Sequence, residues 1–287
     1  MAPSPRCLGM ASNAHAQNAP LPRAETGLQR RLRFVRQYAA WRRAVRELWR
    51  FKWREHRAAP RLGAYHTRRG RVAYFIRHGT RDVGIFSEIF VAGEYDPPAA
   101  VSRLLAALDH PPRILDLGAN VGLFTASCLE RWPGAEIVAV EPDPENLQLL
   151  ERMALVEKRI EVIPACAGAR DGKVRFLAGL FAESQVVSDG HEGETLELPC
   201  VDAFRLAETA DLVKIDIEGS EWEILADPRL AELPVSALVM EWHDKSCPHA
   251  DPGAGAREAL ERAGFEILCE HRPVPQNGTL WAIRRAG

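Results

Sequence analysis

From residue 113 onward, short apolar runs alternate with longer stretches whose apolar residues recur every three to four positions. A nearly continuous apolar run indicates a strand of a parallel sheet covered on both faces, and the longer spacing indicates an amphipathic helix. The predicted strands are 113–117, 136–141, 160–165, 212–217, 237–242, 265–269 and 280–284. The predicted helices are 122–131, 144–156, 220–226 and 255–263, with extra extended pieces at 174–177 and 195–201. This alternation predicts an α/β fold with a doubly wound, mostly parallel sheet.

The amino-terminal part follows a different pattern. Residues 1–27 are predicted to be a disordered tail, because they begin with frequent Pro, Ser, Asn and Ala and lack the apolar segment of a secretory signal. Residues 28–57 place apolar side chains at helical spacing among arginines, so the segment 28–64 is predicted to be a basic amphipathic helix. Residues 65–110 are predicted to form a hairpin and short helices that cap the core, and 111–287 the main domain.

Charge is distributed unevenly along the chain. Of the 287 residues, 46% are hydrophobic and 26% charged, which excludes a wholly disordered or fibrous protein. Residues 1–71 contain 17 Lys and Arg against three acidic residues, although the whole chain has a net charge of −2. No window approaches the roughly 18–20 apolar residues of a membrane-spanning helix. The six cysteines form no Cys-x-x-Cys pair, and most lie in apolar runs, which favours a reduced, cytoplasmic protein with buried thiols.

A glycine-containing loop is the strongest local signal for a cofactor. Asp116-Leu117-Gly118-Ala119-Asn120-Val121-Gly122 ends a predicted strand and opens a helix, where glycine allows a sharp turn close to a ligand. Glu141 ends the next strand, where a carboxylate can accept hydrogen bonds from both hydroxyls of a ribose. The sequence therefore predicts a nucleoside-containing cofactor. The alternative interpretation is that the glycines only allow close strand–helix packing and that Glu141 is a solvated strand end.

The residue types in this loop favour one cofactor over another. A dinucleotide loop has the spacing Gly-x-Gly-x-x-Gly and faces a pyrophosphate, which the carboxylate of Asp116 would repel. S-adenosylmethionine carries an ammonium and a sulfonium group and no phosphate. We therefore predict S-adenosylmethionine as the cofactor.

Several stretches resemble a known family. Residues 114–122, Ile-Leu-Asp-Leu-Gly-Ala-Asn-Val-Gly, and residues 140–146, Val-Glu-Pro-Asp-Pro-Glu-Asn, resemble class I S-adenosylmethionine-dependent methyltransferases. Residues 214–221, Lys-Ile-Asp-Ile-Glu-Gly-Ser-Glu, narrow the resemblance to the FkbM family. Residues 85–95 and 278–280 also resemble that family. The resemblance extends over most of the chain but does not include the basic helix.

The resemblance implies a seven-stranded sheet whose last strand runs antiparallel. It also implies methylation of a hydroxyl on a sugar, a glycan or a polyketide-type metabolite. By position, it assigns cofactor contacts to Asp116, Gly118, Ala119, Asn120, Gly122, Glu141, Pro142, Cys166 and Asp216. Within that set the glycine loop would surround the methionine moiety and ribose, Glu141 would bind the ribose hydroxyls, and Cys166 would lie near the adenine.

Candidate catalytic residues follow the fourth and fifth predicted strands. Open α/β sheets bind ligands at the carboxyl ends of their strands. Asp216 and Glu218 lie at the end of one such strand, and Glu241 and His243 at the end of the next. A hydroxyl nucleophile needs a general base, and an imidazole titrates near neutral pH. The predicted catalytic residues are therefore Asp216, Glu218 and His243, with His243 as the base.

These residues also have structural interpretations. Lys214 can neutralise a neighbouring carboxylate, Ser220 and Glu223 match a capping box, and Glu221 can complement a helix dipole. Asp216, Glu218, Glu241 and His243 also offer ligands compatible with Mg²⁺ or Mn²⁺, whereas His243, Cys247 and His249 resemble a zinc site only loosely. Because methyl transfer to an alcohol needs no Lewis acid, we predict no metal.

The basic helix at 28–57 is compatible with several binding partners. It can pack on the acidic domain within one chain or across a homodimer, lie on an anionic membrane, or bind nucleic acid. Its apolar stripe and its tryptophans, Trp41, Trp49 and Trp53, favour packing or a peripheral membrane contact over phosphate contact alone. The acceptor is expected to be a small molecule or glycan. A non-catalytic binding module and an NAD-dependent oxidoreductase stay open as other functions.

Overall fold

The computed structural model describes residues 38–57, 61–177, 185–187 and 195–285. The chain divides into one unit of residues 1–38 and another of residues 39–287, and the description below concerns the second. The predicted disordered tail and the first part of the predicted basic helix lie outside the described residues. Within the described part, every helix is too short or too polar to cross a membrane.

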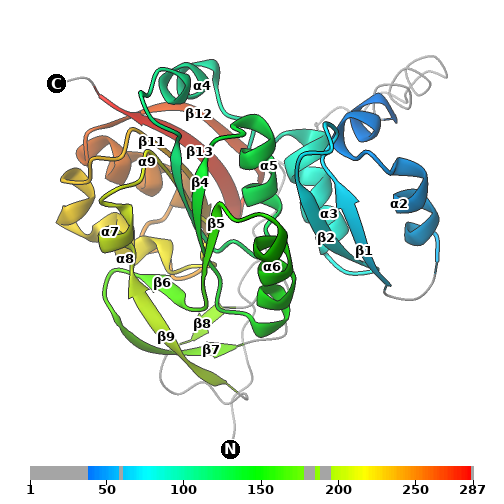
Figure 1. Ribbon diagram of the computed structural model, residues 1–287. Coiled ribbons are helices and arrows are strands. Elements are labelled where there is room, and N and C mark those ends of the chain that lie inside the picture. The colour runs from blue at the N-terminus through cyan, green and yellow to red at the C-terminus, as the bar shows by residue number, and fades with distance from the viewer. Residues whose placement is uncertain (1–37, 58–60, 178–184, 188–194, 286–287) are drawn as a thin grey trace, which may run out of the picture. The chain divides into compact units, whose positions relative to one another are not determined.

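A seven-stranded sheet forms the centre of the fold, in the order β12-β13-β11-β10-β3-β4-β5 (Figure 1). Its strands are β3 (Arg113–Leu117), β4 (Glu136–Val140), β5 (Ile160–Ile163), β10 (Leu212–Ile215), β11 (Ala237–His243), β12 (Phe265–Val274) and β13 (Asn277–Arg284). All neighbouring pairs are parallel except those of β13, which runs antiparallel to β11 and β12. The predicted doubly wound, mostly parallel sheet with an antiparallel last strand is confirmed.

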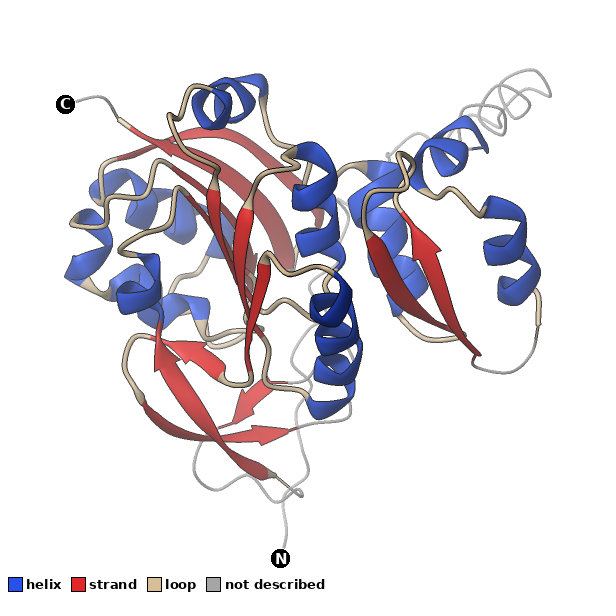
Figure 2. Cartoon of the chain, viewed as in Figure 1, coloured by secondary structure: helices blue, strands red, loops and turns tan. Residues whose placement is uncertain are grey.

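Helices cover both faces of this sheet (Figure 2). One face packs against α4 (Ala99–Ala106), α5 (Leu123–Arg131) and α6 (Pro144–Val156). The other packs against α7 (Ala203–Ala207), α8 (Glu221–Ala226) and α9 (Pro252–Arg262). Strand β3 is buried on both faces, because Ile114 enters one core while Leu115 and Leu117 enter the other. This burial explains why its apolar run is nearly continuous.

A smaller sheet follows β5. It consists of β6 (Cys166–Gly168), β9 (Leu196–Asp202), β7 (Gly172–Leu177) and β8 (Gln185–Val187), in that order. The described cysteines are free thiols, and Cys128 and Cys166 are buried. Cys269 is exposed, so the expected burial of the thiols holds only in part.

The expected continuous helix at 28–64 is interrupted in its described part. Residues 38–44 are helical, the helix breaks at 45–47, and α2 (Leu48–Glu55) follows. The helix breaks where residues 46 and 47 form hydrogen bonds with strand β1 (Arg61–His66). The Arg46 N–H donates to the His66 carbonyl (3.2 Å), and the carboxylate of Glu47 accepts from the backbone N–H of His66 (3.0 Å). The last residues of the predicted helical segment therefore belong to a strand.

The predicted hairpin pairs β1 with β2 (Ala73–His78) in antiparallel register. It continues into α3 (Asp82–Phe86) and a π-helical turn, Ser87–Ala92. Arg77 of β2 donates to both carboxylate oxygens of Asp82 (2.9 Å each) and to Oδ1 of Asn146 on α6 (2.6 Å). The bonds to Asp82 join the hairpin to α3, and the bond to Asn146 joins it to α6, the helix that follows β4.

Candidate functional site

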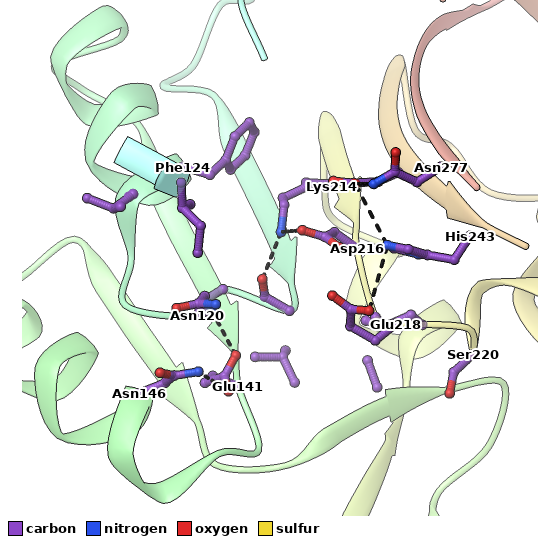
Figure 3. A pocket seen from close by; sticks show the side chains of 18 of the residues that line it. Asn120, Phe124, Glu141, Asn146, Lys214, Asp216, Glu218, Ser220, His243 and Asn277 are labelled. Atoms are coloured by element: carbon purple, nitrogen blue, oxygen red, sulfur yellow. Dashed lines mark hydrogen bonds and ion pairs between the residues drawn. The ribbon is translucent and has the colours of Figure 1, made fainter. Parts of the chain in front are cut away.

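A cavity of about 390 Å³ lies at the carboxyl ends of the central strands. This volume is within the usual range of small-molecule sites. Asn120, Glu141 and Asn146 lie on one side of it, and Asp216, Glu218 and His243 lie on the other (Figure 3). The cavity thus brings the predicted ribose-binding residue and the predicted catalytic residues into one site.

The glycine loop approaches the end of β10 closely. Gly118 has φ +75°, and a Cβ at this position would lie 1.7 Å from the carbonyl oxygen of Asp216, so only glycine fits. The backbone N–H groups of Gly118 and Ala119 both donate to the Val140 carbonyl (3.0 Å each). Gly118, Ala119 and Asn120 line the cavity, as predicted for this loop.

The carboxylate of Glu141 joins this loop to the start of α6. It accepts from the backbone N–H of Asn120 (2.8 Å), the backbone N–H of Asp143 (2.9 Å) and Nδ2 of Asn146 (3.3 Å). Burial raises the pKa of Glu141 to about 7, although these donors lower it. A carboxylate has about four acceptor positions, so this side chain retains capacity for a ligand hydroxyl.

Two residues predicted to contact the cofactor occupy other positions. Asp116 is fully buried and is absent from the cavity lining; its Oδ2 accepts from Thr125 Oγ1 (2.7 Å). The prediction that Asp116 faces a cationic ligand at the mouth of the loop is therefore wrong in its geometry. Gly122 has φ +83° and faces Leu150 and Met153 of α6, so its role is close helix packing. The predicted contacts Pro142, Cys166 and Asp216 do line the cavity.

Lys214 supplies the positive charge beneath this loop. Its Nζ lies 3.4 Å from Asp116 Oδ1 and 3.2 Å from Asp216 Oδ2, and it donates to the Gly118 carbonyl (2.7 Å). Burial alone lowers the pKa of Lys214, but Asp216 and Asp116 outweigh that effect and raise it. The ammonium group therefore persists at neutral pH and holds the ends of β3 and β10 together.

Tyr95 and Glu241 form a hydrogen-bonded pair in the lining of the same cavity. The Tyr95 hydroxyl donates to Glu241 Oε2 (2.6 Å), and Asn277 Nδ2 donates to Glu241 Oε1 (2.9 Å). Burial and the nearby charge of Asp216 raise the pKa of Glu241 to about 7. Burial also raises the pKa of Tyr95 well above its usual range, so its hydroxyl remains a donor.

Glu218 adopts an unusual backbone conformation at the edge of the cavity. Its φ is +55°, a region that is strained for a residue with a long side chain. Burial and the neighbouring Asp216 raise its pKa to about 7. Strain held next to a cavity is typical of functional sites, and this carboxylate can gain or lose a proton near neutral pH.

His243 is fixed by a buried carboxylate. Nδ1 of His243 lies 2.9 Å from Glu221 Oε1, which also accepts the His243 backbone N–H (2.8 Å). Nε2 lies 3.8 Å from Glu218 and 3.7 Å from Glu241. Burial lowers the pKa of His243, but Glu221 and the other carboxylates raise it to about 10. An imidazolium has no free lone pair, which argues against the predicted role of His243 as the base at neutral pH.

The structure tests the structural roles predicted for Ser220, Glu221 and Glu223. Ser220 makes no side-chain capping bond, so the predicted capping box with Glu223 is not formed. Glu221 instead holds His243 and accepts the Gly219 N–H (2.7 Å). Tyr95, Asn146 and Asn277 also belong to the site, and the sequence analysis assigned them no role. Tyr95 and Asn146 each end a stretch that carried the family resemblance, and Asn277 directly precedes another, residues 278–280.

Three of these side chains could hold a divalent cation. Ligand atoms of Asp216, Glu241 and His243 lie within 4.8 Å of one another. Each of them already has protein partners: Lys214 for Asp216, Tyr95 and Asn277 for Glu241, and Glu221 for His243. The cluster therefore has much of its charge compensated by the protein.

Together, the fold and the site define a class of protein. A doubly wound sheet with a glycine loop after one central strand, here β3, and a carboxylate after the next, here Glu141 after β4, is the arrangement of class I methyltransferases. The family model described as the methyltransferase FkbM domain matches residues 116–267, which is more than half of the chain. The chain belongs to the FkbM methyltransferase family, and its cofactor is S-adenosylmethionine.

Curated relatives agree with this assignment. The chain is 27% identical over 200 residues to the 31-O-demethyl-FK506 methyltransferase FkbM of Streptomyces tacrolimicus, covering 56% of this chain and 75% of that protein. It is 25% identical over 240 residues to methyltransferase sdnD of Sordaria araneosa, covering 69% and 87%. It is 26% identical over 167 residues to the 2-O-methyltransferase NoeI of Sinorhizobium fredii, covering 50% and 68%. Aeropyrum pernix fibrillarin matches with a TM-score of 0.39 and 17% identity over 77% of this chain and 94% of that one, a likeness too low to carry an argument.

Proposed function

We propose that this protein transfers a methyl group from S-adenosylmethionine to a hydroxyl of a sugar, glycan or polyketide-type metabolite. One observation carries the proposal: a single cavity is lined on one side by the glycine loop and Glu141 and on the other by Glu218 and Glu241, two carboxylates whose pKa is raised. An alcohol must lose its proton as its oxygen attacks, and a base that titrates near neutral pH suits that task.

The residues on the loop side fit the cofactor. S-adenosylmethionine, when bound, supplies a methyl group that its positively charged sulfur has already activated. Glu141 has unused acceptor capacity for a ribose hydroxyl, and Cys166 and Ala167 also line the cavity. Asp216 provides negative charge for a cationic ligand, and Lys214 compensates only part of it.

Glu218 is the proposed general base. Its carboxylate lines the cavity, whereas both oxygens of Glu241 accept hydrogen bonds from Tyr95 or Asn277. Glu218 would accept the hydroxyl proton as the acceptor oxygen bonds the methyl carbon and the bond between that carbon and sulfur breaks, which leaves a neutral thioether. The His243 imidazolium, 3.8 Å from Glu218, stabilises the carboxylate form before the transfer. Asp216 and Glu241 would then position the acceptor.

The names of two relatives support an oxygen acceptor. One acts on 31-O-demethyl-FK506, and another is a 2-O-methyltransferase. The test is incubation of the purified protein with isotopically labelled S-adenosylmethionine and a panel of glycans, free sugars and polyketides. We expect the label on an oxygen of the product, as located by mass spectrometry and NMR. Label found only on nitrogen or carbon would contradict the proposal.

Glu141→Ala is expected to raise the Kd for S-adenosylmethionine about 10- to 100-fold, because hydrogen bonds to a charged group contribute about 1.5–3 kcal/mol. Isothermal titration calorimetry measures this change. The control is Glu145→Ala, which removes a carboxylate that is 58% exposed at the start of α6. For the wild type, affinity should fall below pH 7, because protonation of Glu141, whose pKa is about 7, removes an acceptor. Equal affinity in both variants would refute the ribose assignment.

Methyl transfer is expected to be insensitive to EDTA. The ammonium of Lys214 lies 3.2 Å from Asp216, and the raised pKa of His243 keeps its imidazole protonated, so two of the three potential ligands are engaged. The rate is measured after chelation and again with added Mg²⁺ or Mn²⁺. A stimulation of about tenfold or more by either ion would show that a metal acts as a Lewis acid here.

A further inference from the structure

The outward side of α2 carries two tryptophans that the core does not use. Trp49 is 74% exposed and Trp53 is 48% exposed, and their spacing of four residues places them on one side of the helix. Phe51 points the opposite way and is fully buried. Burying such aromatic side chains releases substantial hydrophobic free energy, so their exposure indicates an interaction surface.

Arginines surround these tryptophans. We define the Trp–Arg face as Arg46, Trp49, Arg50, Trp53 and Arg57, all of which are exposed. The guanidinium of Arg57 lies 4.1 Å from the ring centroid of Trp53 and covers it. The face therefore combines flat aromatic rings with several positive charges.

The acidic residues of this segment point elsewhere. Glu47 and Glu55 are the only acids between residues 39 and 57. Glu47 lies 2.8 Å from Nδ1 of His66, and Glu55 lies 3.0 Å from Nδ1 of His78. Both carboxylates are thus held by the hairpin, which leaves the Trp–Arg face strongly positive.

We propose that the Trp–Arg face binds the surface of a lipid bilayer that carries anionic headgroups. The indole ring is amphipathic and prefers the depth at which headgroups meet acyl chains. Guanidinium groups bind phosphate through paired hydrogen bonds, and each basic residue near an anionic surface adds about 1 kcal/mol of attraction. A single amphipathic helix with these two features lies in the plane of the interface.

The geometry favours a membrane over a nucleic acid. Proteins that stack bases do so in a positively charged groove that follows the strand. Trp49, at 74% exposure, instead stands out from the protein surface. Such a side chain can enter a soft interface without a matching groove.

The experiment is sedimentation of the full chain with vesicles of phosphatidylcholine alone and with vesicles that also contain phosphatidylglycerol. We expect binding to the anionic vesicles that weakens as salt rises, and little binding to the neutral ones. Trp49→Ala/Trp53→Ala should lower the partition coefficient at least about tenfold, because both rings leave the interface. Arg50→Gln/Arg57→Gln should reduce the preference for anionic vesicles.

The matched control is Leu155→Ala/Val156→Ala. These side chains are 69% and 70% exposed, so the control removes apolar side chains at least as exposed as Trp53 from the end of α6. It should leave vesicle binding unchanged, and all variants should still bind S-adenosylmethionine, which shows that they are folded. The proposal is overturned if anionic vesicles do not bind the protein, or if the tryptophan pair lowers vesicle binding no more than the control does. It is also overturned if the tryptophan pair leaves vesicle binding unchanged and weakens only the binding of a single-stranded oligonucleotide.

Discussion

Glu218→Gln is expected to lower kcat about 10²- to 10⁴-fold, the usual contribution of a general base. Gln has nearly the same shape as Glu but cannot accept the acceptor's proton. The Kd for S-adenosylmethionine should change little, because Glu141 and the glycine loop are on the other side of the cavity (Figure 3). Turnover is measured with the acceptor found in the labelling screen, and cofactor binding by calorimetry.

The pH profile provides a second test of the same residue. The pKa of Glu218 is raised to about 7, and only its carboxylate form accepts a proton, so the wild-type rate should rise as the pH increases through 7. Glu223→Gln is the matched control, because Glu223 is an exposed carboxylate on the adjacent helix α8. If Glu218→Gln retains both the rate and the rise with pH, the base is another group, and Glu241 becomes the first alternative.

Lys214→Met is expected to lower the free energy of unfolding by about 3–5 kcal/mol, because it leaves the buried carboxylate of Asp116 without its counter-charge. Lys214 is 3% exposed, and Asp116 is fully buried. Urea denaturation measures the loss. Lys173→Met is the control, since Lys173 pairs with Glu197 on an exposed surface, where solvent screens the interaction and such pairs contribute little to stability.

A double variant separates the lost charge from lost packing. Lys214→Met/Asp116→Asn removes both partners, so it should recover part of the stability that Lys214→Met loses. If Lys214→Met alone is as stable as the wild type, the pairing of Lys214 with Asp116 does not stabilise the fold, and the proposed support beneath the glycine loop fails.

The central sheet could be predicted from the sequence because each of its strands is marked by residues that are adjacent in the chain. Each strand is a short apolar run, and α6 begins at Pro144, as predicted, with Asp143 as its cap. Gly118 and Glu141 were identifiable for the same reason, since each ends a strand or begins a turn. The break in the amino-terminal helix was not predictable, because it depends on His66, which comes close to Arg46 only in the folded protein.

The electrostatics of the site depend on contacts that are distant in sequence. His243 was predicted to be a base from its ordinary pKa, but Glu221 lies beside it only after β10, α8 and β11 assemble. The family resemblance assigns Asp116 a cofactor contact by its position two residues before Gly118, whereas the alternation of strand β3 turns its side chain toward Lys214 and Thr125. Burial and partners, which one sequence does not show, decide both roles.

The bond from Arg77 to Asn146 has a consequence for recombination and gene design. Asn146 also donates to Glu141, so a residue of the hairpin is two hydrogen bonds away from the carboxylate assigned to the ribose. The segment that matches the family model starts only at residue 116. In a chimaera joined at that boundary, Glu141 and Asn146 would come from one parent and the residue at position 77 from the other. Exchange of the two segments therefore requires a side chain at position 77 that can donate a hydrogen bond to Asn146.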